Sequence, residues 1–342
     1  MKILIVGGGK MGLSHLAILN RFLDKGSIAL CDSSVLSRYL FGKLGFCTFS
    51  SLDQALATGI AWQGAVVATP TSSHFPIAHS LLKLGIPCFI EKPLTLDPSK
   101  SQILVDLQVE QGTIVQMGLV ARFIQPFVRL RYVFATGILG RPLSYRGRMM
   151  GNVVKKPDNT SWRTDFQRGG GCLNEYGPHL LDLCRSIFGE VRDLHYARYG
   201  SVHSMRGDDQ FEIRWEHANG VQADLFLDWC DTSRRKSVID FSVEFEHGTV
   251  LANNAEFSVN IKFDAPIDAE HRMLLQESAD SYPVGFYLRG EEFSLQLEIF
   301  LQRVFGRQIL RAPIDPALAA TIQDGFAVDC LIRDIATMGG LK

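Results

Sequence analysis

A glycine-rich loop after the first apolar run restricts the fold of this chain more than any other feature. The run Ile3–Val6 leads directly into Gly7-Gly8-Gly9-Lys10-Met11-Gly12, and a helical pattern follows over residues 13–23. This is Gly-x-Gly-x-x-Gly placed between a strand and a helix. Gly7 permits a tight turn, Gly9 lets the backbone approach a pyrophosphate, and Gly12 allows the helix to pack closely on the strand. The helix N-terminus then offers N–H groups and its positive dipole end to phosphates.

Strand-like and helix-like segments alternate through the first 120 residues. Short runs rich in apolar or β-branched residues occur at 3–6, 28–31, 64–69, 88–90 and 113–117. Helical patterns lie between several of them, at 13–23, 52–57, 75–84 and 99–111. Such alternation predicts a doubly wound parallel sheet with helices on both faces, the Rossmann type of α/β fold.

An acidic residue lies twenty positions after Gly12, at the end of the second predicted strand. It is Asp32, and its carboxylate is placed to accept hydrogen bonds from the adenosine ribose hydroxyls and to repel a 2′-phosphate. The neighbouring Ser33 and Ser34 supply no cation for such a phosphate. The motif therefore favours NAD over NADP, the alternative being that Asp32 only caps a turn.

Length, charge and cysteine content exclude several classes of protein. A chain of 342 residues is expected to form two domains, and a net charge of -1 argues against nucleic acid as the main partner. No apolar run approaches the roughly 18 residues of a membrane span, and the N-terminus does not resemble a signal peptide. The seven cysteines contain no Cys-x-x-Cys pair, so no metal site is predicted and a reducing, cytoplasmic location is expected.

The second half of the chain changes pattern from about residue 190. Apolar residues alternate with polar ones at 211–216, 221–229 and 239–245, with Asn219-Gly220 and His247-Gly248 as turns between them. This predicts an antiparallel sheet with one apolar and one polar face, the polar face being either solvated or an oligomer contact. Further strands or helices are indicated at 143–149, 127–135, 291–305 and 316–338. The turn-rich segment 151–171 is expected to be functional, because long loops in compact domains usually are.

Two segments carry the candidate chemistry. Glu91-Lys92-Pro93 ends a strand at the edge of the sheet where ligands bind, so Lys92 is placed to reach a substrate beside the cofactor. The segment 169–182 contains Glu175 and His179, which share one face if a helix begins near Asn174. Because proline is tolerated only in a first turn, Pro178 suggests a later start. His179 is a candidate general base, and the alternative is a histidine capped by Asp182 on a core helix.

These clusters together resemble the Gfo/Idh/MocA family of NAD(P)-dependent oxidoreductases. The resemblance spans nearly the whole chain. It rests on residues 7–12 with Met11 and His15, Ala68-Thr69-Pro70 with His74, Glu91-Lys92-Pro93-Leu94, Gln116-Met117-Gly118 followed by Arg122-Phe123, Trp162-Arg163, and residues 170–182.

The family resemblance implies a division of the chain and a set of site residues. It implies a Rossmann domain over 1–120 and a substrate-binding and oligomerisation domain over 121–342, built on a large, mostly antiparallel, open-faced sheet, with C-terminal helices that can pack back on the first domain. The implied catalytic residues are Lys92, His179 and Glu175. The implied cofactor-binding residues are Gly7, Gly9, Lys10, Met11, Gly12, Asp32, Thr69, Pro70, His74, Glu91 and Lys92, although His74 and His79 read as structural from the sequence alone. The predicted substrate-binding residues are Arg122, Trp162, Arg163, Asn174 and Glu175. The chain departs from the family pattern at Glu175, where an aspartate is usual, so the carboxylate reaches one methylene further.

The resulting hypothesis is hydride transfer between NAD and a secondary hydroxyl or ketone of a sugar, cyclitol or sugar nucleotide. His179 is expected to exchange the hydroxyl proton, and Lys92 to stabilise the developing alkoxide. Two alternatives stay open: an NAD-dependent glycosidase that uses transient oxidation, and a cofactor-binding regulator without turnover. A homodimer or homotetramer through the C-terminal sheet is expected. The sequence does not identify the substrate or the physiological direction.

Overall fold

The computed structural model describes residues 2–157, 161–276, 284, 286–310, 312 and 314–341. The predicted functional loop 151–171 is therefore described except for residues 158–160. The chain forms two compact units, which are described separately. The first contains Met1–Val120 with Tyr282–Asp329, and the second contains Ala121–Ser281 with Cys330–Lys342.

The first unit is built on a six-stranded, fully parallel sheet in the order β3-β2-β1-β4-β5-β6. The strands are β1 (Ile3–Val6), β2 (Ile28–Cys31), β3 (Cys47–Phe49), β4 (Gly64–Val67), β5 (Cys88–Ile90) and β6 (Val115–Met117). All except β3 consist entirely of buried residues, as expected for strands covered on both faces. The predicted doubly wound parallel sheet is confirmed.

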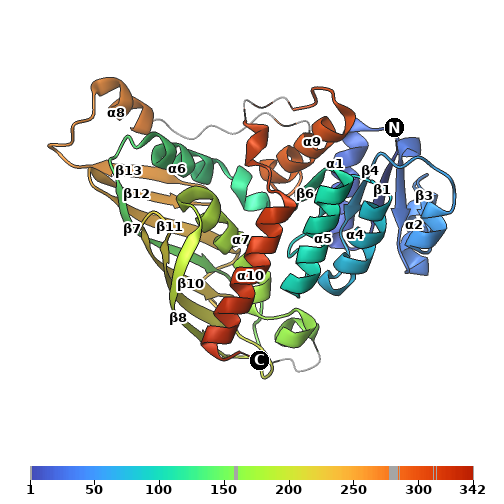
Figure 1. Ribbon diagram of the computed structural model, residues 1–342, viewed down its shortest axis with the longest axis horizontal. Coiled ribbons are helices and arrows are strands. Elements are labelled where there is room, and N and C mark those ends of the chain that lie inside the picture. The colour runs from blue at the N-terminus through green and yellow to red at the C-terminus, as the bar shows by residue number, and fades with distance from the viewer. Residues whose placement is uncertain are drawn as a thin grey trace. The chain divides into compact units, whose positions relative to one another are not determined.

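Helices cover this sheet, and the last two of them come from the C-terminal part of the sequence (Figure 1). They are α1 (Lys10–Phe22), α2 (Val35–Lys43), α3 (Leu52–Leu56), α4 (His74–Lys83), α5 (Pro98–Gln111) and α9 (Glu291–Phe305), followed by the first part of α10 (Ile322–Gly339). From α9, Phe300 packs edge-on against Phe89 of β5, with ring centroids 5.9 Å apart. Residues almost 300 positions downstream therefore complete the core around β1.

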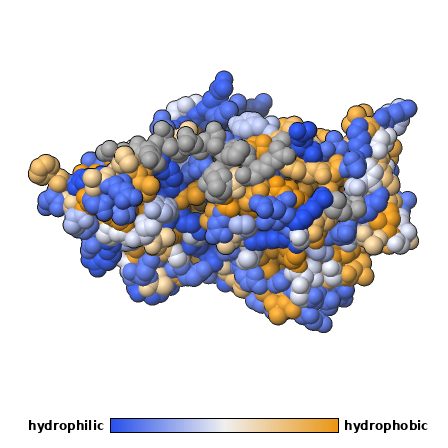
Figure 2. Space-filling view, turned by 90° about the horizontal axis from the view of Figure 1, so that it is seen from above, coloured by the Kyte–Doolittle hydropathy of each residue, from blue (hydrophilic) through white to orange (hydrophobic). Residues whose placement is uncertain are grey.

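Two elements of the first unit were not predicted, namely β3 and α2. Of the nine residues of α2 only Phe41 is buried, while Val35, Leu36, Tyr39 and Leu40 are exposed. Figure 2 shows hydrophobic residues at the surface around this helix, at the right of the view. Because its apolar residues do not mark a buried face, the usual periodicity signal of a helix is missing.

The second unit contains a seven-stranded sheet in the order β13-β12-β11-β7-β10-β9-β8. Its strands are β7 (Pro142–Met150), β8 (Val191–Gly200), β9 (Gln210–His217), β10 (Gln222–Asp228), β11 (Val238–Phe245), β12 (Gly248–Asn253) and β13 (Phe257–Ile261). Every neighbouring pair is antiparallel except β7 with β10. The predicted mostly antiparallel sheet is confirmed, including the turn at Asn219-Gly220 between β9 and β10.

Helices α6 (Gln125–Thr136) and α7 (Cys172–Phe188) pack on one face of this sheet, and α8 (Ala269–Gln276) contacts β13 (Figure 1). Short 3₁₀ segments occur at Lys25–Ser27, Thr71–Ser73, Val120–Phe123, Trp162–Thr164, Phe166–Arg168 and Pro316–Leu318. None of the helices within the described ranges is long and apolar enough to cross a membrane.

Candidate active site

The glycine loop of the first unit leaves the first turn of α1 open to a ligand. Gly7 has φ of +103°, and a Cβ there would overlap the Ala68 carbonyl, while a Cβ at Gly12 would overlap the Gly7 carbonyl oxygen. Gly9 is the N-cap of α1 and, having no side chain, makes no capping hydrogen bond to the N–H groups of that first turn. These N–H groups fit the pyrophosphate of a dinucleotide.

Asp32 follows β2 and is held by the backbone of two loops. Its Oδ2 accepts a hydrogen bond from Gly8 N, and its Oδ1 accepts one from Ser34 N at 2.7 Å. Sequence reasoning missed a cation at this turn: Arg38 Nη1 donates to the carbonyl oxygens of Asp32 and Ser33, at 2.7 and 2.8 Å. The carboxylate is thus fixed at the turn where the ribose of a dinucleotide binds in this fold.

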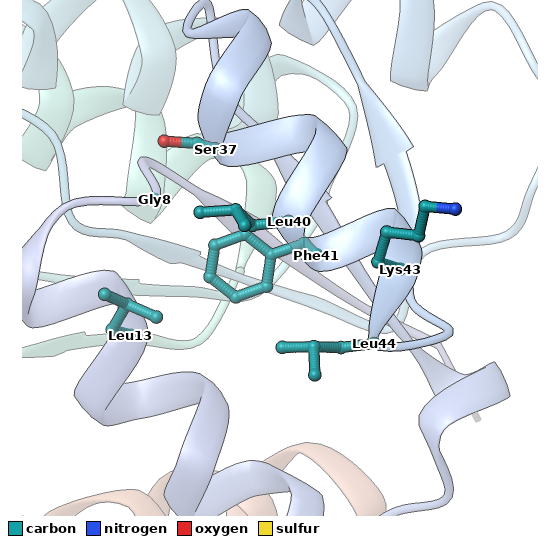
Figure 3. Close-up of a pocket in the computed structure, with 7 residues that line it drawn as sticks. All are labelled: Gly8, Leu13, Ser37, Leu40, Phe41, Lys43 and Leu44. Atoms are coloured by element: carbon teal, nitrogen blue, oxygen red, sulfur yellow. The ribbon is translucent and has the colours of Figure 1, made fainter.

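An apolar hollow lies between α1 and α2, beside the same loop (Figure 3). In the close-up, Leu13 of α1 faces Leu40, Phe41 and Leu44 of α2, and Gly8 lies at one end. Ser37 and Lys43 also line it, but the surface is almost entirely apolar. Lys43 is the one ionisable residue among the described residues that line the hollow, and the residues singled out for the chemistry lie elsewhere.

A buried histidine–carboxylate hydrogen bond links the helix after the glycine loop to the residue after β5. His15 of α1 is fully buried, and its Nε2 lies 2.7 Å from Oε1 of Glu91, the residue after β5. Burial alone would raise the pKa of the Glu91 carboxyl, but the hydrogen bond from His15 and the charge of Lys92 outweigh it and hold that pKa below its usual value. Lys92 therefore directly follows an ionised carboxylate. It lies at the carboxyl ends of the strands, where the glycine loop also lies.

Two further contacts hold the Lys92 loop, whose Lys92-Pro93 peptide bond is cis. The buried His74 ring lies between two carbonyls, with Nδ1 2.9 Å from Pro93 O and Nε2 2.9 Å from Thr69 O. This matches the structural reading of His74, since both of its ring nitrogens face the backbone. Asp329 of α10, which sequence reasoning missed, accepts hydrogen bonds from Thr95 N at 2.8 Å and from Ser101 Oγ at 2.6 Å.

In the second unit, α7 carries Glu175 and His179 on one face. The helix begins at Cys172, earlier than predicted, and Pro178 lies inside it. The cause is Asp208, which accepts hydrogen bonds from Leu173 N through Oδ2 at 2.6 Å and from Cys172 N through its carbonyl at 3.0 Å. All residues of α7 are buried except Glu175, His179 and Ser186, so the predicted pair stands on the accessible face.

Arg122 was predicted to line the substrate, but its guanidinium is buried against α7. Its Nε and Nη2 donate to the two carboxylate oxygens of Asp182, at 2.8 and 2.6 Å, and the side chains are 6% and 1% exposed. The prediction is therefore corrected: a buried, bidentate pair has no surface to offer a substrate. Asp182 is also the residue that the alternative interpretation of His179 assigned as its cap.

The loop before α7 folds back on its first turn. Asn174 is also buried, and its Nδ2 donates to Gly170 O at 2.8 Å, so its amide holds this loop. Trp162 and Arg163 are exposed, with the guanidinium of Arg163 5.0 Å from the centre of the Trp162 ring. The carbonyl of Arg163 accepts a hydrogen bond from Gly171 N at 2.8 Å.

The structure thus brings the candidate residues together in two groups. Gly7, Gly9, Lys10, Met11, Gly12, Asp32, Thr69, Pro70, His74, Glu91 and Lys92 lie in the first unit, at or next to the carboxyl ends of β1, β2, β4 and β5. Arg122, Trp162, Arg163, Asn174, Glu175 and His179 lie in the second unit, on α7 or in segments that contact it or precede it. Within the described parts of the chain, no group of three or more His, Cys, Asp or Glu is arranged to hold a metal ion.

Comparison with known proteins assigns a family model to each half of the chain. Residues 1–119 match the oxidoreductase family with an NAD-binding Rossmann fold, and residues 127–251 match the GFO/IDH/MocA C-terminal domain. Inositol 2-dehydrogenase 4 of Saccharopolyspora erythraea is 28% identical over 180 residues, which is 47% of this chain and 53% of that protein. Oxidoreductase P35 of Formosa agariphila is 24% identical over 183 residues, which is 52% of this chain and 56% of that protein. The chain thus spans about half the length of these relatives.

Solved structures share the fold over nearly the whole length. An NAD binding oxidoreductase from Klebsiella pneumoniae has a TM-score of 0.81 at 17% identity, covering 99% of this chain and 97% of that one. The WlbA dehydrogenase from Bordetella pertussis, in complex with NADH and UDP-GlcNAcA, has a TM-score of 0.79 at 18% identity, covering 99% and 95%.

Proposed function

The chain belongs to the GFO/IDH/MocA family of oxidoreductases, and on that premise we propose that it is an NAD-dependent dehydrogenase. The reaction is hydride transfer between the nicotinamide and a secondary hydroxyl or ketone of a sugar, cyclitol or sugar nucleotide. One observation carries the proposal: on a largely buried α7, Glu175 and His179 share the accessible face. Ionisable side chains that stay accessible on a mostly buried helix do not contribute to the core. Such pairs are common at functional sites.

The proposed mechanism divides the work between three side chains. His179 takes the proton of the substrate hydroxyl and returns it in the reverse direction. The Lys92 ammonium donates a hydrogen bond to the same oxygen and stabilises its developing negative charge. Glu175 orients His179 or binds a neighbouring hydroxyl of the substrate. A bound nicotinamide would supply the hydride chemistry. Glu91, whose pKa is held below its usual value by the hydrogen bond from His15 and by the charge of Lys92, directly precedes Lys92.

The cofactor assignment rests on the glycine loop and Asp32. The open first turn of α1 suits a pyrophosphate, and the Asp32 carboxylate suits ribose hydroxyls and opposes a 2′-phosphate. The substrate class is supported by relatives: inositol 2-dehydrogenases recur among the curated proteins, and a levoglucosan dehydrogenase shares the fold with a TM-score of 0.76.

The test is NAD reduction by the purified protein with a panel of sugars, cyclitols and nucleotide sugars. Lys92→Ala and His179→Ala are expected to lower kcat by at least about a hundredfold, because each removes a group that acts on the reacting oxygen. NADH binding, followed by its fluorescence, should be retained in both variants. Ser186→Ala is the matched control, since Ser186 is the other accessible residue of α7.

Three results would overturn the proposal. Full activity of either variant would contradict the mechanism. Release of a glycosidic leaving group without net NADH would favour the glycosidase, and tight NADH binding without turnover on any substrate would favour a regulator.

We also propose that the chain self-associates through the face of the seven-stranded sheet opposite α6 and α7. Alternate residues of β7, β9, β10 and β11 on this face are polar or charged, and Arg214 Nε lies 3.9 Å from Asp224 Oδ1. A surface with both signs of charge is suited to pairing with a second copy of itself. Sedimentation of the wild type and of Arg214→Glu tests this; an unchanged monomer in both would contradict it. We further propose a cytoplasmic location, which the seven cysteines without a Cys-x-x-Cys pair support.

A further inference from the structure

Three loops lie together at one end of the strands of the second unit, the end at which α7 begins. They are residues 151–171 after β7, 201–209 between β8 and β9, and 229–237 between β10 and β11. The strand register places them together, because Met150 lies opposite both Asp228 and Val238, and Gln210 lies opposite Asp228 and Gly200. These three segments, without residues 158–160, are called the edge loops below.

Backbone hydrogen bonds join the edge loops to each other and to α7. Phe166 N donates to Arg206 O at 3.0 Å, which links the first loop to the second. Gly171 N donates to Arg163 O at 2.8 Å, directly before the first residue of α7. The third loop is joined through Ser237, whose hydroxyl lies 2.5 Å from the hydroxyl of Tyr176, the neighbour of Glu175. The edge loops therefore surround the N-terminal half of α7.

The edge loops carry exposed cations on this framework. Arg163, Arg168 and Arg206 are all exposed, and none of the three has an ion-pair partner in the part of the chain that the structure describes. Arg235 and Lys236 of the third loop are exposed as well. The protein as a whole has net charge -1, so this excess of cations is local.

The acidic residues of the same loops mostly point inward. Asp208 and Asp209 are both 0% exposed and are occupied by hydrogen bonds from Leu173 N and from the backbone of residues 202–204. Asp231 is paired with Arg234, at 3.4 Å. Among the described residues of the edge loops, the remaining partly exposed carboxylate is that of Asp165, in the same loop as Arg163 and Arg168 and bridged to Arg206.

We propose that the edge loops bind an oxyanion carried by the substrate, so that the substrate is an acidic sugar rather than a neutral one. The inference rests on the proposed function, because it assigns a substrate class to the α7 face that holds Glu175 and His179. Arginine suits an oxyanion because its planar guanidinium presents paired N–H donors that match a carboxylate or a phosphate. The Trp162 ring beneath Arg163 restricts the guanidinium and adds a flat surface for a sugar ring.

The test is equilibrium binding to the intact protein in the presence of NADH, where oxidation of a hydroxyl does not proceed. The probes are D-glucose, D-glucuronate and D-glucose 1-phosphate, measured by calorimetry at low salt. The two anions are expected to bind at least about tenfold more tightly than glucose, and the preference should shrink as salt is added. Which anion binds more tightly distinguishes a carboxylate substrate from a phosphate one.

Single substitutions Arg163→Gln, Arg168→Gln and Arg206→Gln assign the effect to these side chains. If the arginine binds the anion, its substitution should weaken anion binding by roughly three- to tenfold and leave glucose binding unchanged. Arg307→Gln is the matched control, because Arg307 is also exposed and stacks on a neighbouring ring, that of Phe305.

The outcomes separate this inference from the proposed function. Equal affinity for glucose and both anions, or an equal loss in Arg307→Gln, would overturn the inference, and oxidation of neutral sugars or cyclitols by the same protein would leave the dehydrogenase standing. Tight binding of an anion that depends on these arginines, without NADH formation from any sugar and NAD⁺, would support the anion site and overturn the dehydrogenase.

Discussion

His15 and Glu91 form a buried hydrogen bond that joins the helix after the glycine loop to the loop carrying Lys92. The distance from His15 Nε2 to Glu91 Oε1 is 2.7 Å, and the edge of the His15 ring packs against Phe89 of β5. The pair couples the two sequence motifs that define the first unit, since Glu91 directly precedes Lys92. Buried charges of this kind stabilise a structure only while both partners are present.

Removing the histidine should therefore cost more than a histidine usually contributes. His15→Leu leaves Glu91 buried without its partner and is expected to lower the free energy of unfolding by about 3–5 kcal/mol. Urea unfolding followed by circular dichroism measures this. His79→Leu is the control, because the ring of His79 only packs beside Phe75, and a similar loss in both variants would contradict the role of the pair.

The Arg122–Asp182 pair makes a related prediction in the second unit. Arg122→Leu or Asp182→Leu alone should destabilise the protein by about 3–5 kcal/mol, because each leaves one buried charge uncompensated. The double variant should recover most of that loss, since two apolar side chains fill the same space. A double-mutant cycle by urea unfolding tests it; additive losses would show that the two side chains do not act as a pair.

Asp329 gives a prediction about pH. Burial raises the pKa of its carboxyl to about 7, whereas the unfolded chain releases this proton near about pH 4. The folded state therefore holds an extra proton between these values, and the stability due to this group falls as the pH rises from about 4 to about 7.

Asp329→Asn should remove that dependence while its amide oxygen still accepts from Thr95 and Ser101. Relative to wild type, the variant is expected to gain roughly 2–3 kcal/mol between pH 5 and pH 8. Parallel urea titrations at the two pH values measure the difference. A constant offset between wild type and variant would show that the carboxyl does not titrate in this range.

Asp32 makes a prediction about cofactor choice. Asp32→Ala removes the acceptor for the ribose hydroxyls and the repulsion of a 2′-phosphate, and Arg38 remains at the same turn. The ratio of NADPH to NADH dissociation constants should fall by roughly tenfold or more. Fluorescence titration with both nucleotides checks it, with Asp53→Asn as a control at an exposed carboxylate. An unchanged ratio would mean that Asp32 does not select between the cofactors.

Local signals explain what could be predicted from the sequence. The glycine loop, the first two strands and the Asn219-Gly220 turn depend on residues next to one another in the chain, so their spacing is sufficient. The fold class and the strands on both sides of α1 follow from that spacing. Helix α2 was missed because its apolar residues are exposed, which removes the periodic pattern on which such predictions rest.

Long-range contacts explain the rest. The start of α7 is set by Asp208, which lies 35 residues beyond Leu173 and has no local signature. The burial of Arg122 depends on Asp182, 60 residues further along the chain. From the sequence, Arg122 was therefore predicted to bind substrate, whereas in the structure it pairs with the buried carboxylate of Asp182.

The position of α9 in the first unit has a consequence for how the protein is synthesised. Leu297, Phe300 and Leu301 lie in the same core as Ile3 and Ile5, so the core around β1 remains incomplete until α9 has left the ribosome. Domains usually fold in the order of their synthesis, but here β1 and α9, almost 300 residues apart, belong to one core. A nascent or truncated chain that stops before α9 exposes an apolar sheet surface, which makes it a substrate for chaperones and proteases. The packed core of this unit is therefore complete only once residue 301 has been made.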